Sequence, residues 1–282
     1  MERRTFIKKS AAAMVAGMIL PKITSAFSKD KIIGIQLYTI RDLVKKDLPG
    51  TLKILSAIGY RSVEAAGYSE RKFYGLAPAA YRKLVEEFGI NPLSTHSNFK
   101  LADADKVIED TLNAGMKFIF IPWLAEEERQ TLDHYKKLAD DFNKIGEKCR
   151  AAGLTFGYHN HDFEFHKIDG KIPYDILLKE TQPEYVSMQL DLYWMVYAGY
   201  SPLDYFRKYP GRFASWHVKD MIKGDSKEST EIGNGIIDFK EIFSGKKQAG
   251  MQCYFVEQEA FKLDPVESIS ISHRYLKSLK NT

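Results

Sequence analysis

One phrase recurs along the chain and constrains its fold more than any other feature. It consists of a helical end, a glycine, one or two further residues and then an apolar run. The six copies are SAIGYRSVE, EEFGINPLS, LNAGMKFIF, RAAGLTFGY, KYPGRFASW and KQAGMQCYF, with glycines Gly59, Gly89, Gly115, Gly153, Gly211 and Gly250. Glycine accepts the left-handed backbone that ends many helices, and β-branched and aromatic residues favour a strand. Each copy therefore predicts a junction from helix to strand.

The spacing of these junctions indicates how many units the fold has. Successive glycines are 30, 26, 38, 58 and 39 residues apart, and the widest gap holds one more unit at TQPEYVSMQLD, where a proline-containing turn replaces glycine. KIIGIQL adds a strand at the start, and amphipathic stretches such as AYRKLVEEF and HYKKLADDFNKIGEKCRAA fill the gaps. Alternating strands and helices form a parallel sheet, and eight units in about 250 residues predict a single (β/α)8 TIM barrel of the α/β class. The alternative, a doubly wound open sheet, usually has a glycine-rich turn after its first strand, and GIQLYTIRD has none.

The first residues have the composition of an export signal. MERRTFIKKSAAAMVAGMIL places four basic residues before a ten-residue apolar run, an order typical of a secretory signal rather than of a membrane span, which needs about 20 apolar residues. The pair Arg3 and Arg4 resembles the twin-arginine (Tat) pattern, with Glu2 where that pattern prefers Ser or Thr. We therefore expect a Tat-like signal at residues 1–26, a barrel catalytic domain at 27–282, and a periplasmic protein without a membrane span. A disordered basic tail is the alternative.

Removal of the signal leaves a chain without net charge. The whole chain has 41 Lys and Arg against 37 Asp and Glu, and the signal carries five of the former and one of the latter, so 36 of each remain. A neutral chain offers no electrostatic case for binding nucleic acid. Two cysteines, Cys149 and Cys253, are too few for a disulfide framework. A single bridge is one interpretation, but Cys253 lies in an apolar run, which favours a buried free thiol.

Polar side chains follow almost every predicted strand, at the end where a barrel carries its active site. In strand order they are Gln36 with Tyr38, Glu64, His96, Trp123, His159 with His161, Asp191, His217 with Lys219 and Asp220, and Glu257. Each alone has a structural interpretation: a hydrogen-bonded histidine, a helix cap at Asp191, or an ion pair at Glu257, for which Glu259 is a rival. Together they predict a site for one divalent metal ion with nitrogen and oxygen ligands, compatible with Mn²⁺, Zn²⁺, Co²⁺ or Fe²⁺.

The ordered segments MQLDLYW, ASWHVKD and YFVEQE, with the glycine-ended repeats, resemble the xylose isomerase-like superfamily of barrels, specifically its sugar phosphate isomerase/epimerase group. The resemblance extends from about Lys31 to the end of the chain. In that family, Glu, Asp, His and Glu from strands five to eight hold a divalent metal. The resemblance therefore implies His159, Asp191, His217 and Glu257 as ligands. Many relatives have Glu-Asn-His where this chain has His159-Asn160-His161, so His159, His161 or Glu164 is expected to complete the set.

The resemblance implies proton transfer next to a sugar carbonyl through a metal-stabilised enediolate, as in isomerases and epimerases. The catalytic candidates are Glu257, His159, His161 and Lys219. The candidates for contact with the sugar are Gln36, Glu64, His96, Trp123 and Trp194, and core packing is the alternative for both tryptophans. Export favours a sugar without phosphate, and we expect the glycines of IGNGIIDF to form a turn.

Other functions fit parts of the same pattern. A lyase or hydratase could use such a site for β-elimination from 3-keto-glycosides. A non-catalytic protein could bind a metal and a sugar there without turnover. A DNA-repair endonuclease shares the barrel, but its three-metal ligand set and basic groove are not evident in this sequence. The sequence is also compatible with a homo-oligomer.

Overall fold

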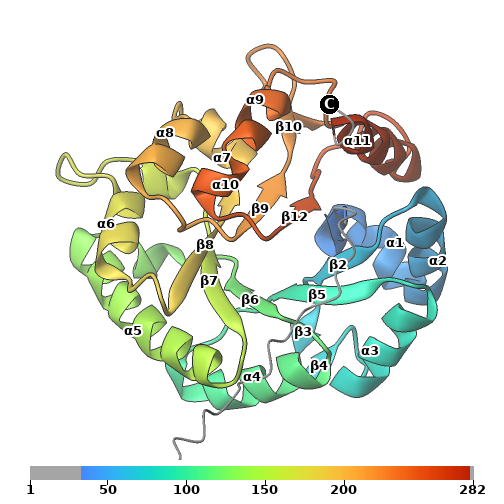
Figure 1. Ribbon diagram of the computed structural model, residues 1–282, viewed down its shortest axis with the longest axis horizontal. Helices are drawn as coiled ribbons and strands as arrows, with labels where there is room; N and C mark the ends of the chain where they lie inside the picture. Colours follow the sequence, from blue (N-terminus) through green and yellow to red (C-terminus); the bar gives the residue numbers. More distant parts are fainter. Residues whose placement is uncertain (1–32, 280–282) are drawn as a thin grey trace, which may run out of the picture. The chain divides into compact units, whose positions relative to one another are not determined.

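The computed structural model describes residues 33–279, and within them it confirms the predicted single barrel. The predicted signal at residues 1–26 lies outside the described residues. Eight parallel strands close in the order β1-β12-β9-β8-β7-β6-β5-β2, and helices surround them (Figure 1). These strands are β1 (Gly34–Gln36), β2 (Ser62–Ala65), β5 (Asn91–His96), β6 (Phe118–Ile121), β7 (Thr155–His159), β8 (Val186–Asp191), β9 (Ser215–Val218) and β12 (Cys253–Val256).

The outer layer consists of helices, several of which are short. They are α1 (Arg41–Lys46), α2 (Leu48–Ile58), α3 (Pro78–Glu87), α4 (Ala104–Asn113), α5 (Leu132–Ala151), α6 (Pro173–Glu180), α7 (Leu192–Tyr197), α8 (Pro202–Lys208), α9 (Phe239–Ser244), α10 (Lys246–Ala249) and α11 (Pro265–Leu279). Among residues 33–279, four 3₁₀ turns lie between a barrel strand and the helix that follows it: η1 (Leu37–Ile40), η2 (Leu101–Asp103), η3 (Glu126–Glu128) and η4 (Phe163–Phe165). Two small hairpins were not predicted: β3 (Tyr68–Ser69) with β4 (Lys72–Phe73), and β10 (Asp220–Met221) with β11 (Ser229–Thr230).

The six repeat glycines lie where the sequence predicts helix ends. All six have positive φ angles, the backbone region that side chains with a Cβ rarely adopt. Gly153, at φ +83°, ends the longest helix, α5, immediately before β7. Each turn from helix to strand requires a residue in the left-handed conformation, and the repeated glycine correctly predicted its position.

The inside of the barrel is apolar at one end and polar at the other. Phe118, Phe120, Phe255, Ala214 and Cys253 form a buried cluster of their own, apart from the larger core beneath the helices. Ala214 directly precedes β9 and Cys253 begins β12, so this cluster lies toward the start of those strands. The polar residues described below stand at the strands' other end. An apolar floor thus closes the barrel beneath its polar rim.

Several smaller expectations can be compared with the described residues. Cys149 and Cys253 are both free and buried. The Asp220 carboxylate accepts hydrogen bonds from the backbone of Gly233 and Gly235, at 2.9 and 3.0 Å, and so stabilises the IGNGIIDF segment as a turn. Within residues 33–279, no helix has the length and apolar composition needed to cross a membrane.

Candidate metal centre and active site

Four side chains converge at the polar end of the barrel: His159, Asp191, His217 and Glu257. Their metal-ligating atoms all lie within 4.8 Å of one another, and all four residues are buried. His159 ends β7, Asp191 ends β8, His217 lies in β9, and Glu257 directly follows β12. Because parallel strands end at the same rim, barrel closure brings together residues that are up to 98 positions apart. These four residues, defined here as the metal cluster, are the set that the family resemblance implies, with His159 at the position that it left open.

Two atoms of this cluster are buried without a hydrogen-bond partner, Oδ2 of Asp191 and Nδ1 of His159. The rest of Asp191 is held firmly. Its Oδ1 accepts the N–H of Trp194 at 3.0 Å and so caps α7, while its own N–H donates to Oδ1 of Asn160 at 3.1 Å. Buried polar atoms normally have partners. Two imidazoles and two carboxylates form a suitable ligand set for a divalent transition metal, which would satisfy both atoms.

His217 lies between two carboxylates. Its Nδ1 is 2.9 Å from Oε2 of Glu257, and its Nε2 is 2.5 Å from Oε1 of Glu64. Burial alone would lower the pKa of this imidazole, but the charges of Glu257 and Glu64 outweigh burial and raise it to about 10. Without a metal ion, His217 is therefore a cation at neutral pH.

The other cluster residues titrate differently because their surroundings differ. Burial raises the pKa of Asp191 to about 7, although Lys219 opposes the shift. Burial would also raise the pKa of Glu257, but His217 and Lys219 hold it well below its usual range. Burial, together with His217, holds the pKa of His159 well below its ordinary value. The cluster thus offers a neutral imidazole and a fixed carboxylate to a cation.

Lys219 places an ammonium group beside the cluster. It is buried, its Nζ donates to Oε1 of Glu259 at 2.5 Å, and it lies 4.7 Å from the ring centres of Tyr193 and Trp194. Burial would lower its pKa, but the carboxylates of Glu257, Asp191 and Glu259 raise it, so Lys219 remains charged. Glu259 thus pairs with Lys219 and is not part of the metal cluster, whereas its rival Glu257 is.

Aromatic rings surround His161 next to the cluster. Its ring centre is 4.7 Å from that of Trp123, 5.7 Å from that of Trp194 and 4.9 Å from that of His159. Burial lowers the pKa of His161 to about 3, so this imidazole is neutral. Trp123 is 43% exposed, which is unusual for so large an apolar side chain. Trp123, His161 and Trp194 therefore form an aromatic wall at the rim.

The structure places three of the expected contact residues away from open surface and outside the metal cluster. Gln36 and Glu64 were expected to touch the sugar, but both are completely buried, and Gln36 donates to Glu64 at 2.8 Å. Glu164 was an alternative ligand, but its carboxyl accepts hydrogen bonds from the Tyr158 hydroxyl and from the His161 N–H. Tyr158 precedes His159 on β7, so strand alternation turns it to the helix side. Glu164 therefore packs behind the strand and does not reach the cluster.

His96 occupies an intermediate position. Its Nε2 lies 2.5 Å from Oε1 of Gln189, and its ring stacks on that of His217 with centres 5.0 Å apart. Together with His159 and His217 it also forms a second, overlapping group of metal-ligating atoms. Its side chain is 10% exposed, so only one edge is accessible from the site.

The barrel architecture and the polar rim match a known family. The model of the xylose isomerase-like TIM barrel family matches residues 52–279, which is most of the chain. The chain belongs to this family. The proteins that the chain resembles include a dehydratase and a sugar phosphate isomerase/epimerase.

Individual relatives vary in how much of the chain they match. Inosose dehydratase from Lacticaseibacillus casei is 27% identical over 170 residues, which make up 54% of this chain and 56% of that protein. The chain therefore spans little more than half the length of this curated relative. A sugar phosphate isomerase/epimerase from Parabacteroides distasonis ATCC 8503 is 28% identical, with a TM-score of 0.78 over 90% of this chain and 96% of the other. The IOLI protein with a bound zinc atom has the same fold, at 15% identity and a TM-score of 0.69 over 88% and 97% of the two chains.

Three polar residues of this family member were missed from sequence: Ser94, Gln189 and Asn160. Ser94 and Gln189 each lie two positions before a predicted rim residue, His96 and Asp191 respectively. Strand alternation turns such pairs to the same, inner face of the barrel. That period of two could have identified Ser94 and Gln189. Asn160 lies just beyond β7, and its contact with Asp191 depends on the tertiary fold.

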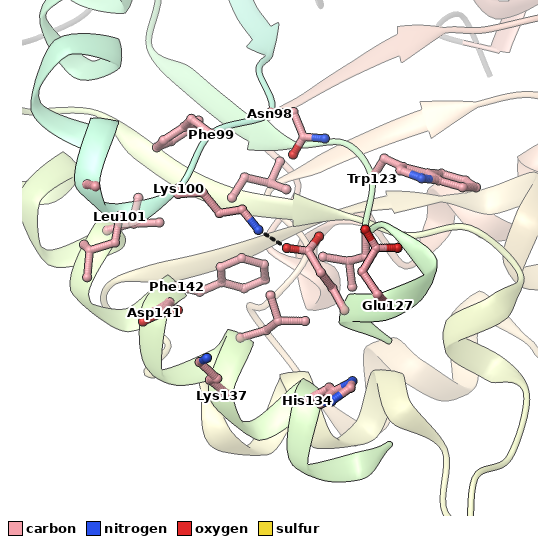
Figure 2. Close-up of a pocket in the computed structure, with 16 residues that line it drawn as sticks. Asn98, Phe99, Lys100, Leu101, Trp123, Glu127, His134, Lys137, Asp141 and Phe142 are labelled. Atoms are coloured by element: carbon pink, nitrogen blue, oxygen red, sulfur yellow. Dashed lines mark hydrogen bonds and ion pairs between the residues drawn. The ribbon is translucent and has the colours of Figure 1, made fainter. Parts of the chain in front are cut away.

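A cavity of about 380 Å³ lies beside α5, between the loops that follow β5 and β6 (Figure 2). Apolar side chains such as Leu138 and Phe142 line its interior, and an ion pair between Lys100 and Glu128 joins the two loops. Trp123 lines this cavity, whereas none of the metal cluster does. The cavity is therefore a neighbour of the candidate site and not the site itself.

Proposed function

We propose that the protein is a divalent-metal-dependent enzyme of the isomerase/epimerase type, which removes a proton next to the carbonyl of an unphosphorylated sugar. The observation that carries this proposal is the metal cluster, in which four ligand atoms converge and buried atoms of Asp191 and His159 have no other partner. His159, Asp191, His217 and Glu257 would hold the ion. Their mixed ligands are compatible with Zn²⁺, Mn²⁺, Co²⁺ or Fe²⁺.

When bound, the ion would stabilise the negative charge that develops on the substrate's oxygen atoms as the proton leaves. Glu257 is the best-placed base. It is 5% exposed, whereas Asp191, the other carboxylate of the cluster, is completely buried. A carboxylate has two oxygen atoms, so Glu257 can hold the ion with one and accept the proton with the other. The Lys219 ammonium adds a fixed positive charge near the developing oxyanion, and the aromatic wall of Trp123, His161 and Trp194 would orient the sugar ring.

The replacement of glutamate by His159 bears on what happens to the abstracted proton. Epimerisation through two carboxylates needs a base on each face of the substrate, and a metal-bound neutral imidazole is a poor base. Glu257 alone can remove the proton and return it to the neighbouring carbon, which gives isomerisation. We therefore favour isomerisation over epimerisation by two glutamates, with His161 as the residue that could serve the second face.

Elimination is the second candidate, and it is favoured by the similarity to inosose dehydratase. The same base would remove the proton, and the bond from the β-carbon to its oxygen substituent would then break. The departing oxygen takes a proton, so that water or an alcohol leaves, and a carbon–carbon double bond remains. A 3-keto-glycoside would release its aglycone in this way.

The first test is metal content. Purified protein is expected to hold about one divalent ion per chain, and both His217→Ala and Asp191→Asn should lose it. His166→Ala is the matched control, because this histidine is 67% exposed and lies outside the cluster. A wild-type protein that stays metal-free after incubation with Mn²⁺ or Zn²⁺ would refute the metal mechanism.

The second test follows the proton. In D₂O, the metal-loaded enzyme should exchange deuterium into the carbon next to the carbonyl of a ketose, and NMR would detect this. Release of the aglycone from 3-keto-glycosides would instead establish elimination. Glu257→Gln should abolish either reaction, and its metal content, measured as in the first test, distinguishes loss of the base from loss of the ion. Binding of sugar by the wild type without exchange or release would identify a non-catalytic sugar-binding protein.

A further inference from the structure

Glu64 is a completely buried carboxylate at the bottom of the site, in the third position of β2. Side chains from four other strands of the barrel point at its two oxygen atoms. Oε1 lies close to Nε2 of Gln36 (2.8 Å), His217 (2.5 Å) and His96 (3.2 Å), and Oε2 accepts hydrogen bonds from Ser94 (2.5 Å) and Gln189 (2.8 Å). Because side chains of the barrel occupy both of its oxygen atoms, Glu64 acts through the residues around it.

The bond to His217 decides which ring nitrogen faces the metal cluster. Both oxygen atoms of Glu64 already accept hydrogen bonds from side-chain amides, Oε1 from Gln36 and Oε2 from Gln189, so Glu64 has no proton to give to His217. The Nε2 atom of His217 must therefore carry a proton. The other nitrogen, Nδ1, faces Glu257 at 2.9 Å. In a neutral imidazole, a proton on Nε2 leaves Nδ1 with the free lone pair.

We propose that Glu64 is a positioning residue that holds His217 with its proton on Nε2 and presents Nδ1 to the metal ion. The inference rests on the proposed function, since it takes the metal cluster as a metal site. Metal-ligating histidines generally donate their second ring N–H to such a partner, which orients the ring and raises its basicity. Gln36 donates to Oε1 and Gln189 to Oε2, so these two amides hold the carboxylate in place even without the hydroxyl of Ser94.

The test compares Glu64→Gln with Ser94→Ala. Glu64→Gln keeps the size of the side chain but removes its charge. Ser94→Ala removes another hydrogen bond to the same carboxylate without touching His217. Equilibrium dialysis of the metal-free proteins against Co²⁺ should show affinity roughly 10- to 100-fold weaker for Glu64→Gln and close to wild type for Ser94→Ala. Thermal unfolding of the metal-free variants measures any general loss of stability separately.

A second measurement needs no variant at Glu64. ¹⁵N NMR of the Zn²⁺-loaded wild type, with the signal of His217 identified by its loss in His217→Ala, should show the proton on Nε2. In the metal-free protein, the Nε2–H signal should lie far downfield because of its hydrogen bond to a carboxylate. This signal should shift in Glu64→Gln and remain in Ser94→Ala.

The outcomes separate the two proposals. Wild-type protein that binds neither Co²⁺ nor Zn²⁺ would overturn the metal function. Cobalt affinity in Glu64→Gln equal to that of the wild type would overturn the positioning role. In the Zn²⁺-loaded wild type, a proton on Nδ1 of His217 in place of Nε2 would also overturn it, even where Glu64→Gln does not fold.

Discussion

At the scale of single residues, Glu164 is the most unusual group outside the metal cluster. Its carboxyl is completely buried, and its hydrogen-bond partners, the Tyr158 hydroxyl and the His161 N–H, are both uncharged. Burial raises its pKa to about 8. An ionised carboxylate in such a place is costly unless it is paired, so this residue should destabilise the fold in a way that depends on pH.

We expect Glu164→Gln to stabilise the protein increasingly as the pH rises from 5 to 8. In the unfolded chain the glutamate loses its proton near its ordinary pKa of 4.5, whereas the folded protein holds the proton up to about pH 8. Between these values the folded state binds more protons, so its stability falls with pH, by at most about 1.4 kcal/mol per pH unit. Glutamine has the same shape without the titration.

Urea unfolding of both proteins at several pH values would measure this difference. Contributions from all other titrating groups are shared and cancel in the comparison. A stability difference that stays constant from pH 5 to 8 would mean that Glu164 ionises normally in the folded protein. His166→Ala, which removes an exposed histidine, is the control for a change at the surface.

Two tryptophans should respond in opposite ways to replacement by alanine. Trp216 is completely buried and stacks on Phe206 with ring centres 5.1 Å apart, so Trp216→Ala should cost about 3–5 kcal/mol of stability. Trp123 is 43% exposed and lies against His161. Trp123→Ala should therefore cost about 1 kcal/mol or less and instead raise KM by roughly three- to tenfold through lost ring contacts with the sugar. Equal losses of stability in the two variants would contradict this division.

At the scale of elements, the sequence predicted what depends on local pattern. Helices α3 and α5 coincide closely with the amphipathic stretches, and positive φ at Gly59, Gly153 and the other repeat glycines follows from chain sterics. The hairpins β3–β4 and β10–β11 were missed because each strand has only two residues. A period of two cannot be recognised over so short a stretch.

Replacing a glycine by alanine should destabilise the protein for different reasons at a helix–strand junction and inside a strand. A Cβ on Gly157, in β7, would lie 2.4 Å from the backbone oxygen of Ser187 on the neighbouring strand. A Cβ on Gly153 would meet nothing within 4 Å, but φ there is +83°. We expect Gly153→Ala to cost roughly 1–2 kcal/mol through backbone strain and Gly157→Ala about 3 kcal/mol or more through steric overlap.

Asparagine distinguishes the two causes, because it tolerates the left-handed region better than alanine does. Gly153→Asn should be more stable than Gly153→Ala, and Gly157→Asn should be no better than Gly157→Ala. Thermal unfolding of the four variants would measure this. An asparagine that rescues position 157 would show that backbone conformation, rather than contact with β8, is the constraint there.

At the scale of the whole molecule, the candidate site depends on closure of the barrel. Once the strands were placed in order, their ends had to meet at one rim, so a ring of polar side chains could be predicted there, whereas the four members of the metal cluster were singled out by the family resemblance. The depth of each side chain could not be predicted. Glu64 and Trp123 both follow the same rule of position, yet one is completely buried and the other is exposed at the mouth. How deeply a side chain is buried depends on its neighbours from other strands, such as Gln189 beside Glu64. The residue pattern of a single strand does not identify these neighbours.

The last prediction concerns export, which we propose from the basic and apolar pattern of residues 1–26. A Tat-like route carries proteins that are already folded, so the metal could enter the cluster before transport. In a bacterial host with this pathway, the full chain should appear in the periplasm, and changing both Arg3 and Arg4 to Lys should retain it in the cytoplasm. Fractionation followed by immunoblotting would measure the distribution.

The metal cluster supplies the control for this experiment. If folding precedes transport, a core variant such as Trp216→Ala should be exported poorly, whereas Asp191→Asn, which alters the cluster but leaves the barrel core intact, should be exported like the wild type. Equal export of the double-lysine variant and the wild type would exclude a twin-arginine signal. Export that tolerates Trp216→Ala would instead indicate that the chain crosses the membrane unfolded, and the ion would then have to bind the cluster outside the cytoplasm.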